Sequence, residues 1–129
     1  MTMDSDKLQE MVRVIKHNWR EEMVVARVYR NLAQRERKPR NRNMLSLMAV
    51  AEEEHAAMWA ERLARLGESV DPREINDLFL QQIRDIDARG VRATIRHIER
   101  EERRHVGEYQ AQIRALNDPE STEILEKVV

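Results

Sequence analysis

The chain has 129 residues, which is the length of a single domain. Hydrophobic residues make up 41% of it and charged residues 36%, but aromatic residues only 4%. This composition favours long charged helices and excludes an all-β or Rossmann-type fold. The 23 Lys and Arg nearly balance the 24 Asp and Glu, so a formal net charge of −1 provides no field that would attract nucleic acid or a membrane.

The sequence contains no cysteine, so any metal site must use carboxylate and imidazole groups. The longest apolar run, residues 47–51, is far too short to cross a bilayer. The N-terminal residues MTMDSDK contain no hydrophobic signal segment. We therefore expect a soluble cytoplasmic domain that spans residues 1–129.

Apolar residues recur at helical spacing and predict an all-α bundle of antiparallel helices. The first helix is expected over residues 5–35, followed by a loop in the basic segment RERKPRNRN, where Pro39 interrupts the pattern. The second is expected to begin near Asn43 and to end at Gly67, a residue typical of helix C-termini.

A third helix is expected from Pro72 to about residue 87, because Asp71 and Pro72 form a typical helix start. It is long enough to carry the chain back along the bundle as a long crossover. The fourth helix is expected from Val91 to Asn117, and a last, truncated helix begins at Ser121.

Acidic residues interrupt three of these apolar patterns at positions that otherwise face the core, namely Glu22, Glu52 and Glu102. Burial of a lone carboxylate is costly unless the group is paired or bound to metal. From the rise of a helix, these three residues lie at one depth, about 15–20 Å from the first interhelical turn. The sequence therefore predicts that carboxylates of three helices converge.

Two of these glutamates precede a histidine, in Glu52-x-x-His55 and Glu102-x-x-His105, so that carboxylate and imidazole share a helix face. Oxygen and nitrogen ligands without sulfur suit iron or manganese better than structural zinc. Carboxylates that bridge imply two metal ions. The alternative is a buried network in which arginines pair with the glutamates, and a satisfied core histidine is the alternative for His105.

The remaining polar residues near these motifs carry weaker signals. Glu53, Glu54, Glu99 and Glu101 are interpreted as surface charges, with Glu99 one turn before Glu102 and able to reach the site. His17 and His97 belong to no motif.

Together these features resemble the ferritin-like superfamily, in which a helix with Glu-x6-Tyr and a helix with Glu-x-x-His form a pair that is repeated after a long crossover. More narrowly, NWREEMVVARVYRNLA, AEEEHAAMWAERLARLG and IEREERRHVGEYQAQI resemble the rubrerythrin-like di-iron domain fused to vacuolar-iron-transporter-family proteins. The resemblance covers nearly the whole chain. It implies these metal ligands: Glu22, Glu52, His55, Glu102 and, near a position where rubrerythrins have a further carboxylate, His105. Tyr29 and Tyr109 would lie beside the ligands without binding metal.

The resemblance also implies a function. Two iron ions per site would bind, with manganese or zinc as substitutes. The domain would capture Fe(II) and oxidise it with oxygen or peroxide, as a ferroxidase or peroxide scavenger that serves a membrane iron transporter outside this chain. The alternative is a metal-sensing or oligomerising module without redox turnover.

An internal repeat relates Glu22 and Tyr29 to Glu102 and Tyr109, which have the same spacing. On this repeat a second Glu-x-x-His would fall just beyond Val129. We therefore expect a longer parent protein or a homodimer, in which two copies of the first helical hairpin supply two glutamates and two Glu-x-x-His motifs.

Overall fold

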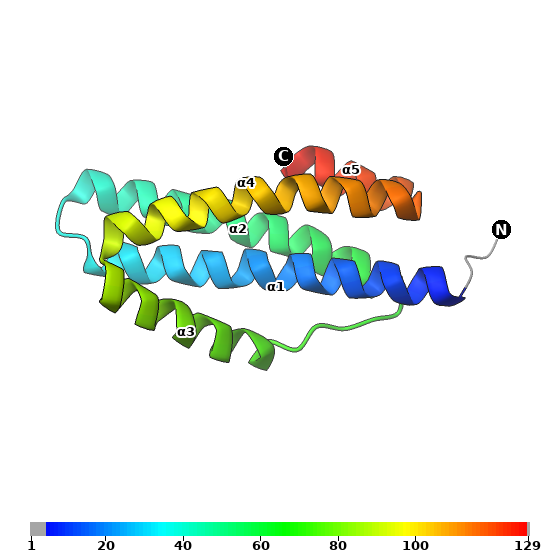
Figure 1. Cartoon of the computed structure of the whole chain (residues 1–129), viewed down its shortest axis with the longest axis horizontal. Coiled ribbons are helices and arrows are strands. Elements are labelled where there is room, and N and C mark those ends of the chain that lie inside the picture. The colour runs from blue at the N-terminus through cyan, green and yellow to red at the C-terminus, as the bar shows by residue number, and fades with distance from the viewer. Residues whose placement is uncertain (1–4, 129) are drawn as a thin grey trace.

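The computed structural model describes residues 5–128, without the side chains of Tyr109, Ile113, Leu116 and Val128. This part of the chain forms helices and no strand, as the composition predicted. The helices are α1 (Ser5–Arg35), α2 (Pro39–Arg65), α3 (Arg73–Arg89), α4 (Val91–Leu116) and α5 (Pro119–Val128). In Figure 1, α1 and α2 run antiparallel, α3 returns the chain along α1, and α4 and α5 form a second hairpin.

The core lies mainly between α1 and α2, because each presents one apolar stripe at helical spacing. Met11, Ile15 and Leu32 of α1 are fully buried, as are Trp59 and Leu63 of α2. The glutamates that interrupt these stripes are therefore carried into the interior between well-packed turns.

The expected loop around Pro39 is wrong, because α2 begins at this proline rather than near Asn43. Lys38 is extended, with φ −79° and ψ 120°, and Pro39 occupies the first helical turn. A proline is compatible with that position because the first N–H groups of a helix have no intrahelical partner. The connection therefore shrinks to residues 36–38, and most of the basic segment becomes the first turn of α2.

The other boundaries differ less from expectation. Helix α3 ends at Arg89 instead of near residue 87, and α5 begins at Pro119, two residues earlier than predicted. Both prolines that follow an aspartate, Pro72 and Pro119, thus lie at a helix start.

Polar contacts fix α3 along α1. Arg20 Nη1 lies 3.1 Å from Glu74 Oε2, and Arg35 Nη1 lies 2.7 Å from Asp87 Oδ1 at the other end of α3. Only Ile75 and Ile86 of α3 are fully buried. Two ion pairs near the ends of α3 and a small apolar contact therefore hold this helix against the bundle.

A buried ion pair fixes α5 against α2. Arg62 Nη2 lies 3.1 Å from Asp118 Oδ1, and both side chains are less than one-tenth exposed. Asp118 also accepts a hydrogen bond from the backbone N–H of Ser121 at 3.2 Å, so the same carboxylate caps the N-terminus of α5. Asn117, with φ 53°, ends α4 just before it.

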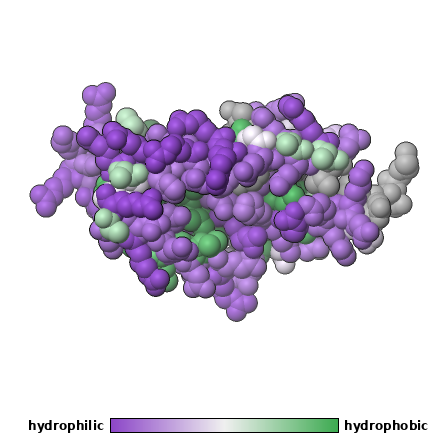
Figure 2. All heavy atoms as spheres, viewed as in Figure 1, coloured by the Kyte–Doolittle hydropathy of each residue, from purple (hydrophilic) through white to green (hydrophobic). Residues whose placement is uncertain are grey.

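The molecular surface is predominantly hydrophilic on the face shown in Figure 2, with hydrophobic residues visible in smaller patches between the helices. Within residues 5–128, no helix combines the length and the apolar character needed to cross a membrane.

We expect Asp118→Ala to lower the free energy of unfolding by about 3 kcal/mol, because it removes a helix cap and leaves Arg62 buried beside only one carboxylate. That remaining partner is Glu120, 3.0 Å from Arg62 Nη1. Urea unfolding followed by circular dichroism measures the loss. Asp118→Asn keeps a capping oxygen and should lose less, whereas equal losses for the two variants would contradict the double role of this carboxylate.

Candidate metal centre

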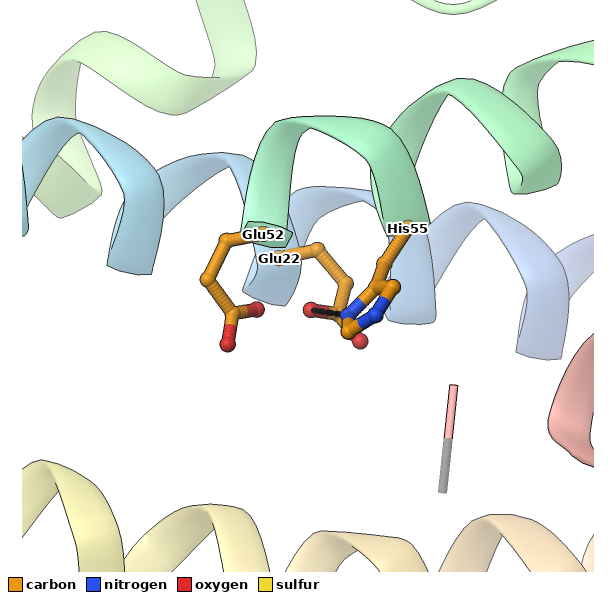
Figure 3. Close-up of side chains that lie close together, drawn as sticks. All are labelled: Glu22, Glu52 and His55. Atoms are coloured by element: carbon orange, nitrogen blue, oxygen red, sulfur yellow. Dashed lines mark ion pairs between the residues drawn. The ribbon is translucent and has the colours of Figure 1, made fainter. Parts of the chain in front are cut away.

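Glu22 of α1 and Glu52 and His55 of α2 point toward α4 from adjacent turns (Figure 3). One possible ligand atom from each lies within 4.8 Å of the others. His55 Nδ1 is 3.6 Å from Glu22 Oε2, and these two side chains are 22% and 12% exposed. The antiparallel hairpin thus places the single glutamate of α1 level with the Glu-x-x-His motif of α2.

Glu102 approaches this group from α4. Its carboxyl group lies within side-chain hydrogen-bonding reach of Glu52, and the charge of Glu52 raises the pKa of Glu102. The Oε1 atom of Glu102 is buried and has no hydrogen-bond partner. The structure therefore brings together carboxyl groups of three helices, while the role of Glu102 as a metal ligand stays a prediction.

His105 lines the same cavity but faces other partners. Its Nδ1 atom lies 3.8 Å from Glu21 Oε2, and its Nε2 atom lies 3.8 Å from Glu101 Oε2. The structure does not bring it into the group formed by Glu22, Glu52 and His55, and its role as a ligand of that group stays a prediction.

Of the two tyrosines of the repeat, only Tyr29 has a side chain that the structure describes. Tyr29 is 1% exposed, and burial, followed by the charges of Glu102 and Glu52, raises its pKa. It therefore stays protonated beside these carboxyl groups. The side chain of Tyr109 lies outside the described residues.

A cavity of about 360 Å³ lies among these groups. Its polar wall includes Glu22, Glu52 and Glu102, and its apolar wall includes Val28 and Ile98. Since a water molecule takes about 30 Å³ of liquid volume, the space is sufficient for ions together with water. Polar ligands in a mainly apolar enclosure are typical of small-ligand sites.

Burial and mutual repulsion suppress the ionisation of the three carboxyl groups. Burial, together with the nearby Glu22, raises the pKa of Glu52 to about 8. Burial and the charge of Glu52 raise the pKa of Glu102 to about 8. The pKa of Glu22 is also raised, chiefly by burial and then by the charges of Glu102 and Glu21. Without an added cation, the site cannot hold all three carboxylates ionised at neutral pH.

Arginines do not supply that cation. In the ion pairs of the described residues, Arg62 binds Asp118 and Arg30 binds Glu53, and neither arginine nor lysine pairs with Glu22, Glu52 or Glu102. The expected alternative of an arginine network therefore lacks its partners in the described part of the chain.

The spacing of the donor atoms can be compared with that of ligands around one metal ion. Ligands bonded at about 2.1 Å lie about 3.0 Å apart when adjacent and about 4.2 Å apart when opposite in octahedral coordination. The 3.6 Å between His55 and Glu22 falls in this range, and the 4.8 Å limit for the whole group exceeds it only slightly.

Sequence reasoning missed the groups around His105. Glu101 was interpreted as a surface charge, but it lines the cavity, and so does Glu21. His17 was assigned to no motif, yet its Nε2 atom lies 3.9 Å from Glu21 Oε1. The available signal was the spacing of four residues in His17-x-x-x-Glu21 and Glu101-x-x-x-His105, which places each pair on one helix face.

Comparisons with known proteins show no family to which the chain belongs: no protein-family model, curated protein or solved structure gives a significant match.

The raised pKa values predict how the metal-free protein responds to pH. A carboxyl group with a raised pKa in the folded state keeps its stabilising contribution below its unfolded pKa and loses it as pH rises through the folded pKa. Glu52 and Glu102 have ordinary values of 4.5 and folded values of about 8, so stability should fall between these limits. We expect a melting temperature about 5 °C lower at pH 8.5 than at pH 6.

Differential scanning fluorimetry in chelator-treated buffer measures this change. Glu52→Gln removes one member of the pair and should flatten the dependence, whereas Glu53→Gln, at an exposed ion pair, should not. An unchanged slope in Glu52→Gln would contradict the electrostatic coupling of the buried carboxyl groups.

Proposed function

We propose that this chain is a ferritin-like metal-binding domain that captures Fe(II) between α1, α2 and α4. The ligands would be Glu22, Glu52, His55 and Glu102. The observation that carries the proposal is the burial of three carboxyl groups from three helices around one cavity, with no basic side chain of the described residues paired to them except His55. A divalent cation removes the repulsion that otherwise keeps these groups protonated.

Iron fits the donor set because carboxylate oxygens and imidazole nitrogens are its common ligands when no thiolate is present. Glu52 is within side-chain hydrogen-bonding reach of both Glu22 and Glu102, which supports a role for its carboxylate as a bridge between two ions. We therefore propose two iron ions per site, with manganese and zinc as substitutes. The resemblance of the sequence motifs to rubrerythrin-like domains supports the same choice.

Oxidation of the captured Fe(II) is the second part of the proposal. Iron supplies the electrons, and oxygen or peroxide accepts them. The residues of this chain would hold the ions, compensate their charge with carboxylates and limit water access with Val28 and Ile98. Tyr29 keeps its proton, so its hydroxyl adds no negative charge to the carboxyl groups.

The partners follow from the same proposal. Fe(II) is the cargo, a membrane iron transporter would receive it, and a second copy of the chain would add further ligands to the site. A metal-sensing or oligomerising module without redox turnover is the other candidate, and the raised pKa values favour it equally because they concern binding alone.

The binding test is an anaerobic titration with Fe(II), with Glu52→Gln as the variant and Glu53→Gln as its neighbour on the same helix. Glu53 makes an exposed ion pair with Arg30, so it is a matched control. We expect Glu52→Gln to weaken Fe(II) binding at least about tenfold, because a neutral amide replaces the central carboxylate. Equal metal content in the three proteins after purification without chelators would contradict a metal site here.

Addition of oxygen or peroxide to the Fe(II)-loaded protein tests the redox part. Absorbance of Fe(III) and consumption of oxygen should rise with the wild type and with Glu53→Gln, and should be largely lost with Glu52→Gln. Tight binding with oxidation no faster than in buffer would remove the ferroxidase assignment and leave the binding module.

A further inference from the structure

An exposed apolar stripe runs along the first half of α2. Met44 is 54% exposed, Leu47 is 71% exposed and Val50 is 41% exposed. Ala51 is exposed as well. Steps of three or four residues place these side chains on one side of the helix, about one turn apart. We call these four residues the outer stripe. Large apolar side chains that gather on one exposed face indicate an interaction surface.

No other part of the described chain covers the outer stripe. Helix α2 packs against α1 on its buried side and against α5 near its C-terminal end, where Arg62 pairs with Asp118. Helix α5 lies toward the other end of the bundle from the first turns of α2 (Figure 1). Within residues 5–128, α4 makes no close backbone contact with α2. The outer stripe is therefore open to a partner.

Charges of opposite sign flank the outer stripe. Arg40 precedes it and Glu54 follows it, and each lies seven residues from Leu47. Because seven residues make nearly two helical turns, all three share one face. Both charged residues are exposed, and in the described part of the chain neither takes part in an ion pair.

The basic end of this face also lacks a local counter-charge. The first turn of α2 contains no acidic residue, so Arg40 lies at the positive end of the helix dipole. A carboxylate brought to this end from outside would be favourable for both the arginine and the helix. The partner surface should therefore be apolar in the middle and acidic where it meets Arg40.

A second copy of α2 has this pattern when it runs antiparallel to the first. A two-fold axis at Leu47 brings Arg40 of each copy level with Glu54 of the other, because both lie about 10 Å along the helix from the axis. The same axis brings Met44 of each copy level with Val50 of the other. A parallel pairing would instead place like charges together at both ends. The face is thus complementary to itself in one direction only.

We propose that the chain forms a two-fold dimer through the outer stripe, with Leu47 at the axis and Arg40 of each copy paired with Glu54 of the other. The interface gives a place to the second copy in the proposed function, but it rests only on these residues and not on metal binding. An interface centred on one helix of each copy is small, so we expect a dissociation constant of about 1–100 µM.

Sedimentation equilibrium of the metal-free protein from about 1 to 500 µM tests the dimer. We expect the wild type to change from monomer to dimer across this range. Leu47→Glu should raise the dissociation constant at least about 100-fold, because two carboxylates would then face each other at the axis. Leu80→Glu is the matched control, since Leu80 is 51% exposed but lies on α3, and it should dimerise like the wild type.

Charge exchange tests the direction of pairing. Arg40→Glu and Glu54→Arg should each raise the dissociation constant about tenfold, because each places like charges together twice in the dimer. The double variant Arg40→Glu/Glu54→Arg restores opposite charges and should return the constant to within about threefold of the wild type. A double variant weaker than both single variants would contradict the antiparallel pairing.

Several outcomes would overturn the interface. A wild type that stays monomeric at the highest concentration would exclude it, and so would a dimer that Leu47→Glu leaves intact. Equal losses in Leu47→Glu and Leu80→Glu would show that the outer stripe is not the contact. Circular dichroism checks that each variant is folded, which these exposed positions should tolerate. Glu52→Gln should dimerise like the wild type while it loses Fe(II) binding, so failure of the interface and failure of the metal centre are distinguished.

Discussion

Repulsion among buried carboxyl groups is the constraint on which the rest of this structure depends. Three helices each bring one glutamate into a shared cavity, and the described residues provide a histidine but no arginine or lysine to neutralise them. Like charges held together at low dielectric are costly, so the groups keep their protons or gain a cation. Leucine at these three positions would avoid the free-energy cost of burying carboxyl groups. Stability alone therefore does not explain the three glutamates.

The arrangement of the helices explains how these groups meet. The short connection between α1 and α2 sets an antiparallel register that makes Glu22 level with Glu52 and His55. The connection 66–72 and α3 together return the chain along the bundle, so α4 starts near the end where α2 began and Glu102 reaches the same depth as Glu52. Local helix geometry and one crossover are thus sufficient to bring these groups together, and none of them lies in a loop.

Much of this was predictable because helical spacing is a strong local signal, and the apolar stripes of α1 and α2 are buried as their pattern indicated. Pro39 was misread because proline both ends helices and begins them, and only the backbone of the preceding residue distinguishes the two. Glu21 and Glu101 were not recognised because glutamates one turn from another charged group are common on any solvated helix. Both contact His105, and the contact of Glu21 with His105 depends on the packing of α1 against α4, which the pattern of a single helix does not reveal.

The ion pair between Arg62 and Asp118 has a consequence well beyond the terminus it caps. Helix α4 contacts α1, while α5 contacts both α4 and α2, so the wall of the cavity opposite α2 is supported at that end through α5. Leu125 of α5 itself lines the cavity. Helix α5 therefore links α4 to α2 at one end of the cavity, so the Arg62–Asp118 pair, which contacts none of the acidic groups, helps to hold α4 at its distance from α2.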